Sequence, residues 1–526
     1  MEDFFFSYAP ISFAATLLLV FFLAASFHRF GKKRRLPPLK GSILHQLLYF
    51  SRIHDYHTDL AGESKTFRLL GPSRSYFYTV DPLVVEHVLR TNFAKYGKGF
   101  YNYHTLKDLL GDGIFAVDGE KWRHQRKLSS YEFSTKNLRD FSGDVFRKAA
   151  AKLAAAISNS ARSNESVDIQ DLFMRSTMDS IFKIGFDVEL DTLSGLSKEG
   201  MAFARAFDEA GDLVLWRYAD PSWMIKKLLN VGSEATLKKD IQIIDEFIYK
   251  LISNKKELLS EQQNQTVGKQ DMLSRFMVEK EKDSENMNDK YLRDIILNII
   301  IAGRDTTAIT LSWFFYMLCN CKHSSLQDQL AREVEDSTAA DHCCTDRAAG
   351  FTETLTEASL SKMQFLHAAL TETLRLHPAI PEDPKICFCD DTLPGRLDIK
   401  KGDMICYLPY SMGRMKFLWG EDAEDFRPER WLDENGAFQA ENPFKFTAFQ
   451  AGPRICLGKD FAYLQMKILS AVLLHFFRFE LKDESRNVRY KSSITLRIDG
   501  GLELLASHRQ TPDIVYEEEE HLCFKN

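Results

Sequence analysis

The sequence has no excess of basic residues and no regular set of cysteines. Its 68 lysines and arginines are outnumbered by 74 aspartates and glutamates, so a net charge of −6 gives nucleic-acid binding no electrostatic support. The nine cysteines are an odd number at irregular spacing, which excludes a small disulfide-rich framework. The C-x-C pairs at 319–321 and 387–389 lack a second cysteine or histidine pair, so no zinc site is expected. We therefore expect a reduced body that faces the cytosol.

Linkers and repeats are also missing. No glycine-, serine- or proline-rich linker divides residues 60–510, and no segment repeats. The chain is 44% hydrophobic and contains 40 phenylalanines, which is enough for a large core. These features predict one large domain over residues 36–510, followed by a polar tail at 511–526.

One uncharged hydrophobic run stands near the N-terminus, at residues 9–27. As a helix at ~1.5 Å per residue it would reach about 28 Å, the thickness of a bilayer core. Glu2 and Asp3 precede the run and basic residues between 29 and 35 follow it, the reverse of the charge order in a cleavable signal. The positive-inside rule keeps the basic flank cytoplasmic. Residues 1–35 are predicted to be a single-span membrane anchor; a buried N-terminal helix is the alternative.

The body follows a mainly helical pattern. Residues 36–90 are strand-like and rich in turns, whereas most segments from 90 to 380 carry apolar residues at helical spacing. After 380 come short strands, a long loop region, a helix at 459–477 and a terminal hairpin. The expected fold class is mainly α with small β-sheets near both ends.

Cys456 stands in a predicted loop whose glycines and arginine would serve no purpose for a cysteine packed in the core. Gly452 and Gly458 flank it, so the backbone can come close to a bulky group and point amides at the sulfur. The helix predicted from Lys459 directs its N-terminal dipole at the loop, which favours a thiolate, and Arg454 adds a cation suited to a ligand carboxylate. A thiolate held in this way is a metal ligand or a nucleophile, and no nearby histidine stands out as a base.

This loop resembles the haem-binding loop of the cytochrome P450 family. It reads FxxGxRxCxG over residues 449–458, and in the family this cysteine is the axial ligand of haem iron. Two further motifs agree: ETLR at 372–375, with Glu372 and Arg375 on one helix face, and FRPERW at 426–431, with Arg430. The resemblance implies a haem-thiolate fold, Cys456 as the metal ligand of haem b, and a buried structural Glu-Arg-Arg network.

The segment 296–315 is apolar on all sides except at 303–307, so it is expected to be a buried helix. Gly303 costs about 1 kcal/mol of helix stability, and a threonine can bend a helix by bonding back to a carbonyl. The motif matches the family's oxygen-activation segment. The resemblance implies that Asp305 and Thr306 are catalytic, Thr306 by a hydrogen bond during dioxygen activation and Asp305 by proton delivery.

The haem propionates of this family require cations. The W-x-x-x-R pair at 122–126 resembles the propionate-binding helix, and the loop itself supplies an arginine. Lysine stands at 385, where many members have arginine, and it offers a point charge in place of a fork. The cofactor-binding residues that the resemblance implies are Trp122, Arg126, Lys385, Phe449, Arg454 and Cys456.

The resemblance implies a monooxygenase that inserts one oxygen atom into a C–H bond, with electrons from NADPH through a cytochrome P450 reductase. A hydrophobic substrate and an endoplasmic reticulum membrane, with the catalytic domain facing the cytosol, are implied by the same resemblance. A basic surface could receive the acidic reductase or could simply be solvated. Its residues are Arg123, His124, Lys127, Arg147, Lys148 and Lys459.

Segments 109–134, 411–432 and 443–459 resemble the plant fatty-acid hydroxylase clan, which implies hydroxylation of a long-chain fatty acid near its methyl end. Tunnel walls are expected at 97–115, 205–235, 302–306, 379–381 and 492–496. Lys98 or Arg217 is a candidate anchor for the carboxylate, with a surface charge as the alternative. Other interpretations are a monooxygenase of terpenoids or other plant metabolites, a hydroperoxide-rearranging enzyme and a non-catalytic haem protein; the Asp305–Thr306 pair disfavours the last two.

Overall fold

A computed structural model describes residues 35–509, except 72–73, 134–135, 262–270, 283–287, 321–323, 339–347 and 487. The predicted membrane anchor and the polar tail lie outside the described residues. Within the described part, one helical stretch, Asp289–Cys319, is long and apolar enough to cross a membrane. It is mostly buried inside the protein, as expected for a core helix.

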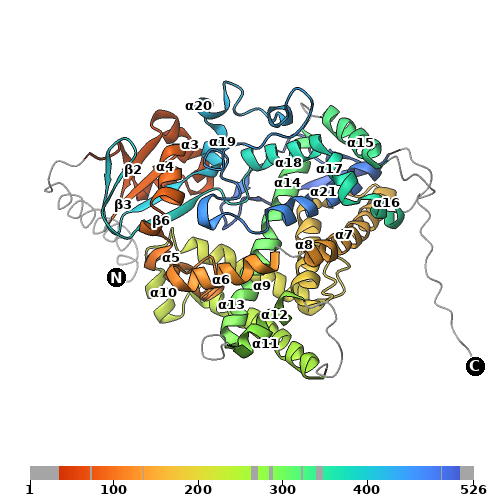
Figure 1. Ribbon diagram of the computed structural model, residues 1–526, viewed down its shortest axis with the longest axis horizontal. Helices are drawn as coiled ribbons and strands as arrows, with labels where there is room; N and C mark the ends of the chain where they lie inside the picture. The colour runs from red at the N-terminus through yellow and green to blue at the C-terminus, as the bar shows by residue number, and fades with distance from the viewer. Residues whose placement is uncertain are drawn as a thin grey trace, which may run out of the picture.

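The prediction of a mainly helical chain with small sheets is confirmed (Figure 1). The first helices are α2 Ile43–Leu48, α3 Ile53–Glu63, α4 Pro82–Glu86, α5 Gly99–Leu110, α6 Gly119–Phe133, α7 Lys136–Ser163, α8 Ile169–Phe186, α9 Lys198–Trp216, α10 Trp223–Leu229 and α11 Ser233–Glu261. The others are α12 Met272–Lys282, α13 Asp289–Gly303, α14 Asp305–Cys319, α15 Ser324–Thr338, α16 Ala348–Thr354, α17 Glu357–Lys362, α18 Gln364–Leu376, α19 Pro409–Arg414, α20 Lys416–Trp419 and α21 Lys459–Phe476.

The largest sheet joins strands from both ends of the chain. Its order is β1 Leu39–Ser42, β2 Thr66–Leu70, β3 Ser75–Thr79, β9 Met404–Tyr407, β6 Asp383–Cys387 and β4 Tyr96–Gly97. A second sheet contains β10 Phe477–Leu481, β13 Glu503–His508 and β5 Val167–Asp168. Two hairpins complete the set: β7 Asp391–Leu393 with β8 Leu397–Ile399, and β11 Tyr490–Lys491 with β12 Arg497–Ile498.

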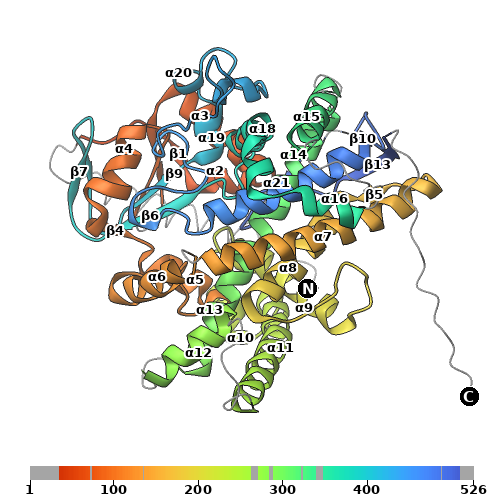
Figure 2. The same cartoon turned by 45° about the vertical axis from the view of Figure 1, so that its right-hand side comes forward.

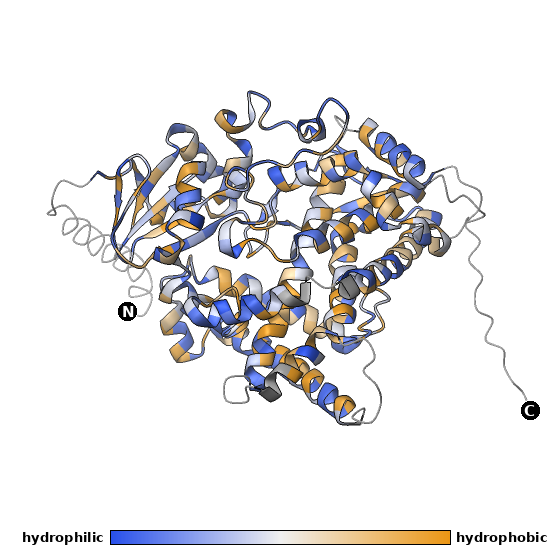
Figure 3. Cartoon of the chain, in the orientation of Figure 1, coloured by the Kyte–Doolittle hydropathy of each residue, from blue (hydrophilic) through white to orange (hydrophobic). Residues whose placement is uncertain are grey.

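The helical part packs around the α13–α14 stretch, which lies between α8, α18 and α21. Figure 2 shows α7 running beside α21, with β10 and β13 at the end of this pair. Hydrophobic and hydrophilic residues alternate along most helices (Figure 3), as expected for helices that bury one face. In contrast, α14 buries Ala308, Leu311, Phe314 and Phe315 around most of its circumference.

The central helix is interrupted where the sequence predicts a kink. α13 ends at Gly303 and α14 begins at Asp305, with Arg304 at φ −89° and ψ −68° between them. A Cβ on Gly303 would lie 2.6 Å from the Ile181 side chain, so glycine lets α13 pack closely on α8. The Thr306 hydroxyl donates to the Ala302 carbonyl at 2.7 Å, the back-bonding that bends helices.

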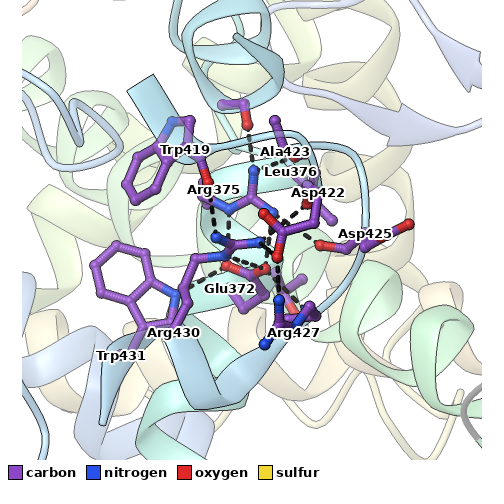
Figure 4. A network of polar contacts seen from close by, with 12 residues as sticks. Glu372, Arg375, Leu376, Trp419, Asp422, Ala423, Asp425, Arg427, Arg430 and Trp431 are labelled. Carbon is purple, nitrogen blue, oxygen red and sulfur yellow. Dashed lines mark hydrogen bonds and ion pairs between the residues drawn. The ribbon is translucent and has the colours of Figure 1, made fainter. Parts of the chain in front are cut away.

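Glu372 on α18 is the centre of a buried polar network (Figure 4). Arg375 donates to both of its carboxylate oxygens at 2.7 Å, and Arg430 donates to one of them at 3.1 Å. The Trp431 indole and the Arg427 backbone N–H add bonds of 2.9 Å each. The predicted Glu-Arg-Arg network is therefore confirmed as a structural contact.

The same network holds the loop that precedes the Cys456 segment. Arg375 donates to the carbonyls of Gly413, Ala423 and Asp425, and Arg430 donates to those of Trp419 and Asp422. Because these carbonyls belong to one loop region, the network ties α18 to residues 413–431.

We expect Glu372→Ala to lower the free energy of unfolding by roughly 3–5 kcal/mol, because it leaves the buried guanidinium of Arg375 without its carboxylate. Thermal or denaturant unfolding of the purified protein measures the loss. Glu120→Ala is the matched control, because Glu120 and Arg123 form the same i,i+3 pair on an exposed helix face. Equal stability of the two variants would contradict the structural role of the network.

Candidate active site

The Cys456 loop lies between a 3-10 turn at Gly452–Arg454 and the start of α21. Gly452 has φ +65°, and a Cβ there would lie 2.0 Å from the Leu89 carbonyl oxygen. The expected need for glycine at this position thus has a concrete cause. Gly458 is the N-cap of α21 with φ −88°, so its backbone conformation is open to other residues. The Cys456 N–H donates to the Phe449 carbonyl at 2.8 Å and closes the loop.

Cys456 is both accessible and deeply placed. Its side chain is exposed, yet burial raises the pKa of its thiol against the opposing effects of the Gly458 amide and the Arg126 charge. The thiol is therefore open to a ligand although protein atoms surround it. The thiolate expected from the helix dipole is therefore not favoured by the protein alone. A bound metal ion would supply the missing stabilisation, because coordination deprotonates a thiol.

The central helix has a similar accessible spot. Ala302 is exposed and Thr306 is half-buried, although Ile301, Asp305 and Thr307 beside them are buried. The two predicted catalytic residues therefore differ in exposure: Thr306 keeps accessible surface, whereas Asp305 is buried in the protein.

Arg126 on α6 is a candidate to bind an anionic group of a ligand. It is half-buried and close enough to Cys456 for the two side chains to influence each other's pKa, and burial lowers the pKa of the guanidinium. Within the described part of the chain, no hydrogen bond or ion pair to another residue is present for Arg126. A guanidinium that is partly withdrawn from water favours an anionic partner, so a bound carboxylate such as a haem propionate fits here.

Arg454 and Trp122 lie together. The Arg454 guanidinium is 4.6 Å from the centre of the Trp122 ring, and it donates to the Val117 carbonyl at 2.9 Å and to Asp118 at 2.7 Å. Its Nε–H is buried without an acceptor among the described residues. Arg454 thus holds the turn between α5 and α6 and keeps one donor for an anion. Phe449 packs against Tyr463, with ring centres 5.3 Å apart.

The other predicted cations are already paired. Lys385 and Lys98 both bind Asp383, at 2.7 and 2.9 Å, and burial lowers the pKa of Lys385 to about 7 against the pull of that carboxylate. Arg217 is buried and binds Glu234 and Asp108 at 2.6 and 2.7 Å. Lys98 and Arg217 are therefore engaged with protein carboxylates, which disfavours them as substrate anchors, and their role stays a prediction. The role of Lys385 at a propionate stays a prediction.

Asp305 has two partners that the sequence analysis missed. Arg304 donates to it at 3.0 Å and Arg497 at 2.9 Å, and both arginines also bind Asp208. Arg304 stands in the recognised motif, and a buried arginine must have acidic partners. Arg497 lies on β12 and Asp208 on α9, and nothing in the sequence indicates that these distant residues meet.

The family profile described as Cytochrome P450 matches residues 35–504. Cytochrome P450 704C1 of Pinus taeda is 48% identical over 511 residues, which cover 95% of this chain and 98% of the relative. Cytochrome P450 704B1 of Arabidopsis thaliana is 44% identical over 92% of this chain and 97% of its own length. Cytochrome P450 94A2 of Vicia sativa is 37% identical over 84% of each chain.

Because Arg126 has no acceptor in the described protein, Arg126→Gln is expected to weaken haem retention about 10- to 100-fold, the worth of a hydrogen bond to a charged group. The rate of haem transfer from the purified protein to apomyoglobin measures this. Arg123→Gln, on the exposed face of the same helix, is the control. Identical transfer rates for the two variants would show that Arg126 holds no propionate.

Proposed function

The chain belongs to the cytochrome P450 family and is a cytochrome P450 monooxygenase; from this we propose that it hydroxylates long-chain fatty acids at or near the methyl end. The observation that carries the assignment of the site is the accessible thiol of Cys456, near the Arg126 guanidinium and the Arg454 Nε–H, which have no acceptor among the described residues. The resemblance of three chain segments to the plant fatty-acid hydroxylase clan supports the substrate class.

Each residue of the site has a separate task. Cys456 is the metal ligand, and Arg126, Arg454 and Trp122 hold the cofactor carboxylates. Haem with a thiolate ligand, when bound, supplies the activation of dioxygen that C–H hydroxylation requires. The Thr306 hydroxyl now donates to the Ala302 carbonyl and can turn its proton toward the accessible side of the helix. Asp305, one residue before it, exchanges protons from the buried side.

Contacts between several segments that we expect to wall the substrate tunnel support this proposal. Leu496 donates its N–H to the Ala379 carbonyl at 3.0 Å, and Ser493 donates to Asp212 on α9 at 2.6 Å. The Ile494 side chain lies against Gly211 of the same helix. An acyl chain enclosed by such segments gains about 0.8 kcal/mol per buried CH₂. Since Lys98 and Arg217 are occupied, we infer that burial of the chain carries most of the affinity and that tunnel length sets the oxidised carbon.

An exposed apolar face near these walls supports a membrane location. Met224, Ile225, Leu228 and Leu229 on α10 are 60%, 63%, 84% and 64% exposed. Leu48, which is 79% exposed, belongs to the same region, because the neighbouring Phe50 packs edge-on against Trp216 just before α10. Apolar side chains on a short helix with Lys226 and Lys227 suit a lipid interface. We propose an endoplasmic reticulum enzyme that takes its substrate from the bilayer and its electrons from NADPH through the reductase.

The test of the ligand is spectroscopic. Cys456→Ala should abolish the red-shifted absorption band of the reduced carbon monoxide complex and all turnover, because no other described cysteine has matching surroundings. Cys389→Ala, at the other exposed cysteine, is the control and should keep the band. A Cys456→Ala protein that keeps the band would refute the assignment.

The test of the substrate uses membranes that contain the full chain and a cytochrome P450 reductase, with NADPH and C12–C18 fatty acids. Mass spectrometry should find products hydroxylated at or near the methyl end, and Cys456→Ala membranes should form none. Terpenoids and sterols are offered in parallel. Oxidation of one of these, with neither a spectral shift nor a product from any fatty acid, would overturn the substrate class and leave the monooxygenase chemistry intact.

A further inference from the structure

Four charged side chains form a closed ring on the buried side of the central helix. Arg304 and Arg497 each donate to both Asp305 and Asp208. The two bonds to Asp305 are 3.0 and 2.9 Å, and the three to Asp208 are 2.5 and 3.1 Å from Arg304 and 2.9 Å from Arg497. The ring joins α9, the junction of α13 and α14, and β12. Each carboxylate therefore shares both arginines with the other.

The ring has an inner and an outer side. The side chains of Asp305 and Arg304 are 5% and 3% exposed, whereas that of Asp208 is 32% exposed. Asp208, Arg304 and Arg497 line a pocket of about 310 Å³, together with the exposed Arg205, and Asp305 does not line it. Asp208 is thus the member of the ring that meets solvent, and the two arginines separate the pocket from Asp305.

The pocket suits water better than an anion. The Nε–H groups of Arg175, Arg304 and Arg497 are buried without acceptors among the described residues, and all three arginines line the pocket. The charges around it balance once Asp305 is included, with four arginines against four aspartates: Arg175, Arg205, Arg304 and Arg497 against Asp168, Asp171, Asp208 and Asp305. Ordered waters would satisfy the free donors, since a polar site of this size has room for several.

We propose that Asp208 is a positioning residue, which holds Arg304 and Arg497 whenever Asp305 releases them. The proposal rests on the role of Asp305 in proton delivery given above. Arg304 and Arg497 each donate a hydrogen bond to one carboxylate oxygen of Asp305, so Asp305 must turn away from them to exchange a proton elsewhere. Asp208 already accepts from both arginines and keeps their charges balanced during this movement. Asp305 takes up one proton for each proton that it passes on.

The first measurement compares Asp208→Asn with wild type in the haem-loaded, reductase-coupled enzyme. Product per NADPH consumed should fall about tenfold, less than the roughly 10²–10⁴-fold that positioned proton transfer itself contributes. The solvent deuterium isotope effect on turnover should rise, and spectral substrate affinity should stay unchanged. Asp208→Glu should restore coupling, because it returns the charge.

The control is Glu199→Gln on α9, the helix that also carries Asp208. Glu199 is exposed, pairs with Lys250 on α11 and does not line the pocket. Coupling of Asp208→Asn equal to that of wild type, or equal losses in Asp208→Asn and Glu199→Gln, would overturn the proposal. Asp305→Asn distinguishes the proton-delivery role of Asp305 from the positioning role of Asp208. If it stays coupled, the proposed role of Asp305 has failed; if it uncouples and Asp208→Asn does not, only the positioning role has failed.

A second readout does not depend on activity. Burial would raise the pKa of Asp208, but Arg304 and Arg497 lower it below its usual range. The ring therefore contributes stability above the unfolded pKa of about 3.9, and this is lost as the pH falls through the lower folded pKa. The acid-side fall in thermal midpoint should shrink in Asp208→Asn. An unchanged acid profile would show that Asp208 does not share the arginines in solution.

Discussion

A buried carboxylate must be compensated by positive charge and hydrogen bonds inside the protein. Glu372 meets this constraint through hydrogen bonds that hold the surrounding segments together. Its five donors come from α18 and from the segment 427–431, so the bonds exist only when these parts are assembled. The loop region 413–431 depends on Arg375 and Arg430 for the carbonyl contacts that hold it. The Cys456 loop comes next in the chain, and its position rests on this frame and on the close approach of Gly452 to Leu89.

The same constraint separates structural cations from those available to a ligand. Arg217, Arg375 and Arg304 are buried and engaged with protein carboxylates. Arg126 and the Nε of Arg454 are the donors near Cys456 without acceptors in the described protein. The difference lies in the neighbours and not in the residue type. This is why a cation near a predicted tunnel was a poor guide to a substrate anchor.

The sequence was sufficient where function depends on local spacing. The Cys456 loop, the break at Gly303–Arg304 and the Glu372–Arg375 pair are each set within a few residues, and the helical pattern indicated the fold class. Contacts between distant segments could not be predicted. Asp208 and Arg497 meet across 289 residues, and Ser75 donates to Asp403 across 328. Such contacts arise from the packing of whole elements, which no local pattern records. The direction of the helix dipole at α21 was predicted correctly, but burial of the thiol outweighs it.

The strand order of the six-stranded sheet delays its completion during synthesis of the chain. β3 is hydrogen-bonded to β9, so the centre of the sheet closes only after residue 407 has been synthesised. At ribosomal rates of about 5–20 residues per second, the β2–β3 hairpin waits roughly 15 to 60 seconds for its partner. Phe67 and Phe77, fully buried in the finished protein, belong to this waiting hairpin. The nascent chain therefore carries an apolar strand edge through most of its synthesis, and this edge depends on chaperones for protection from aggregation during that interval.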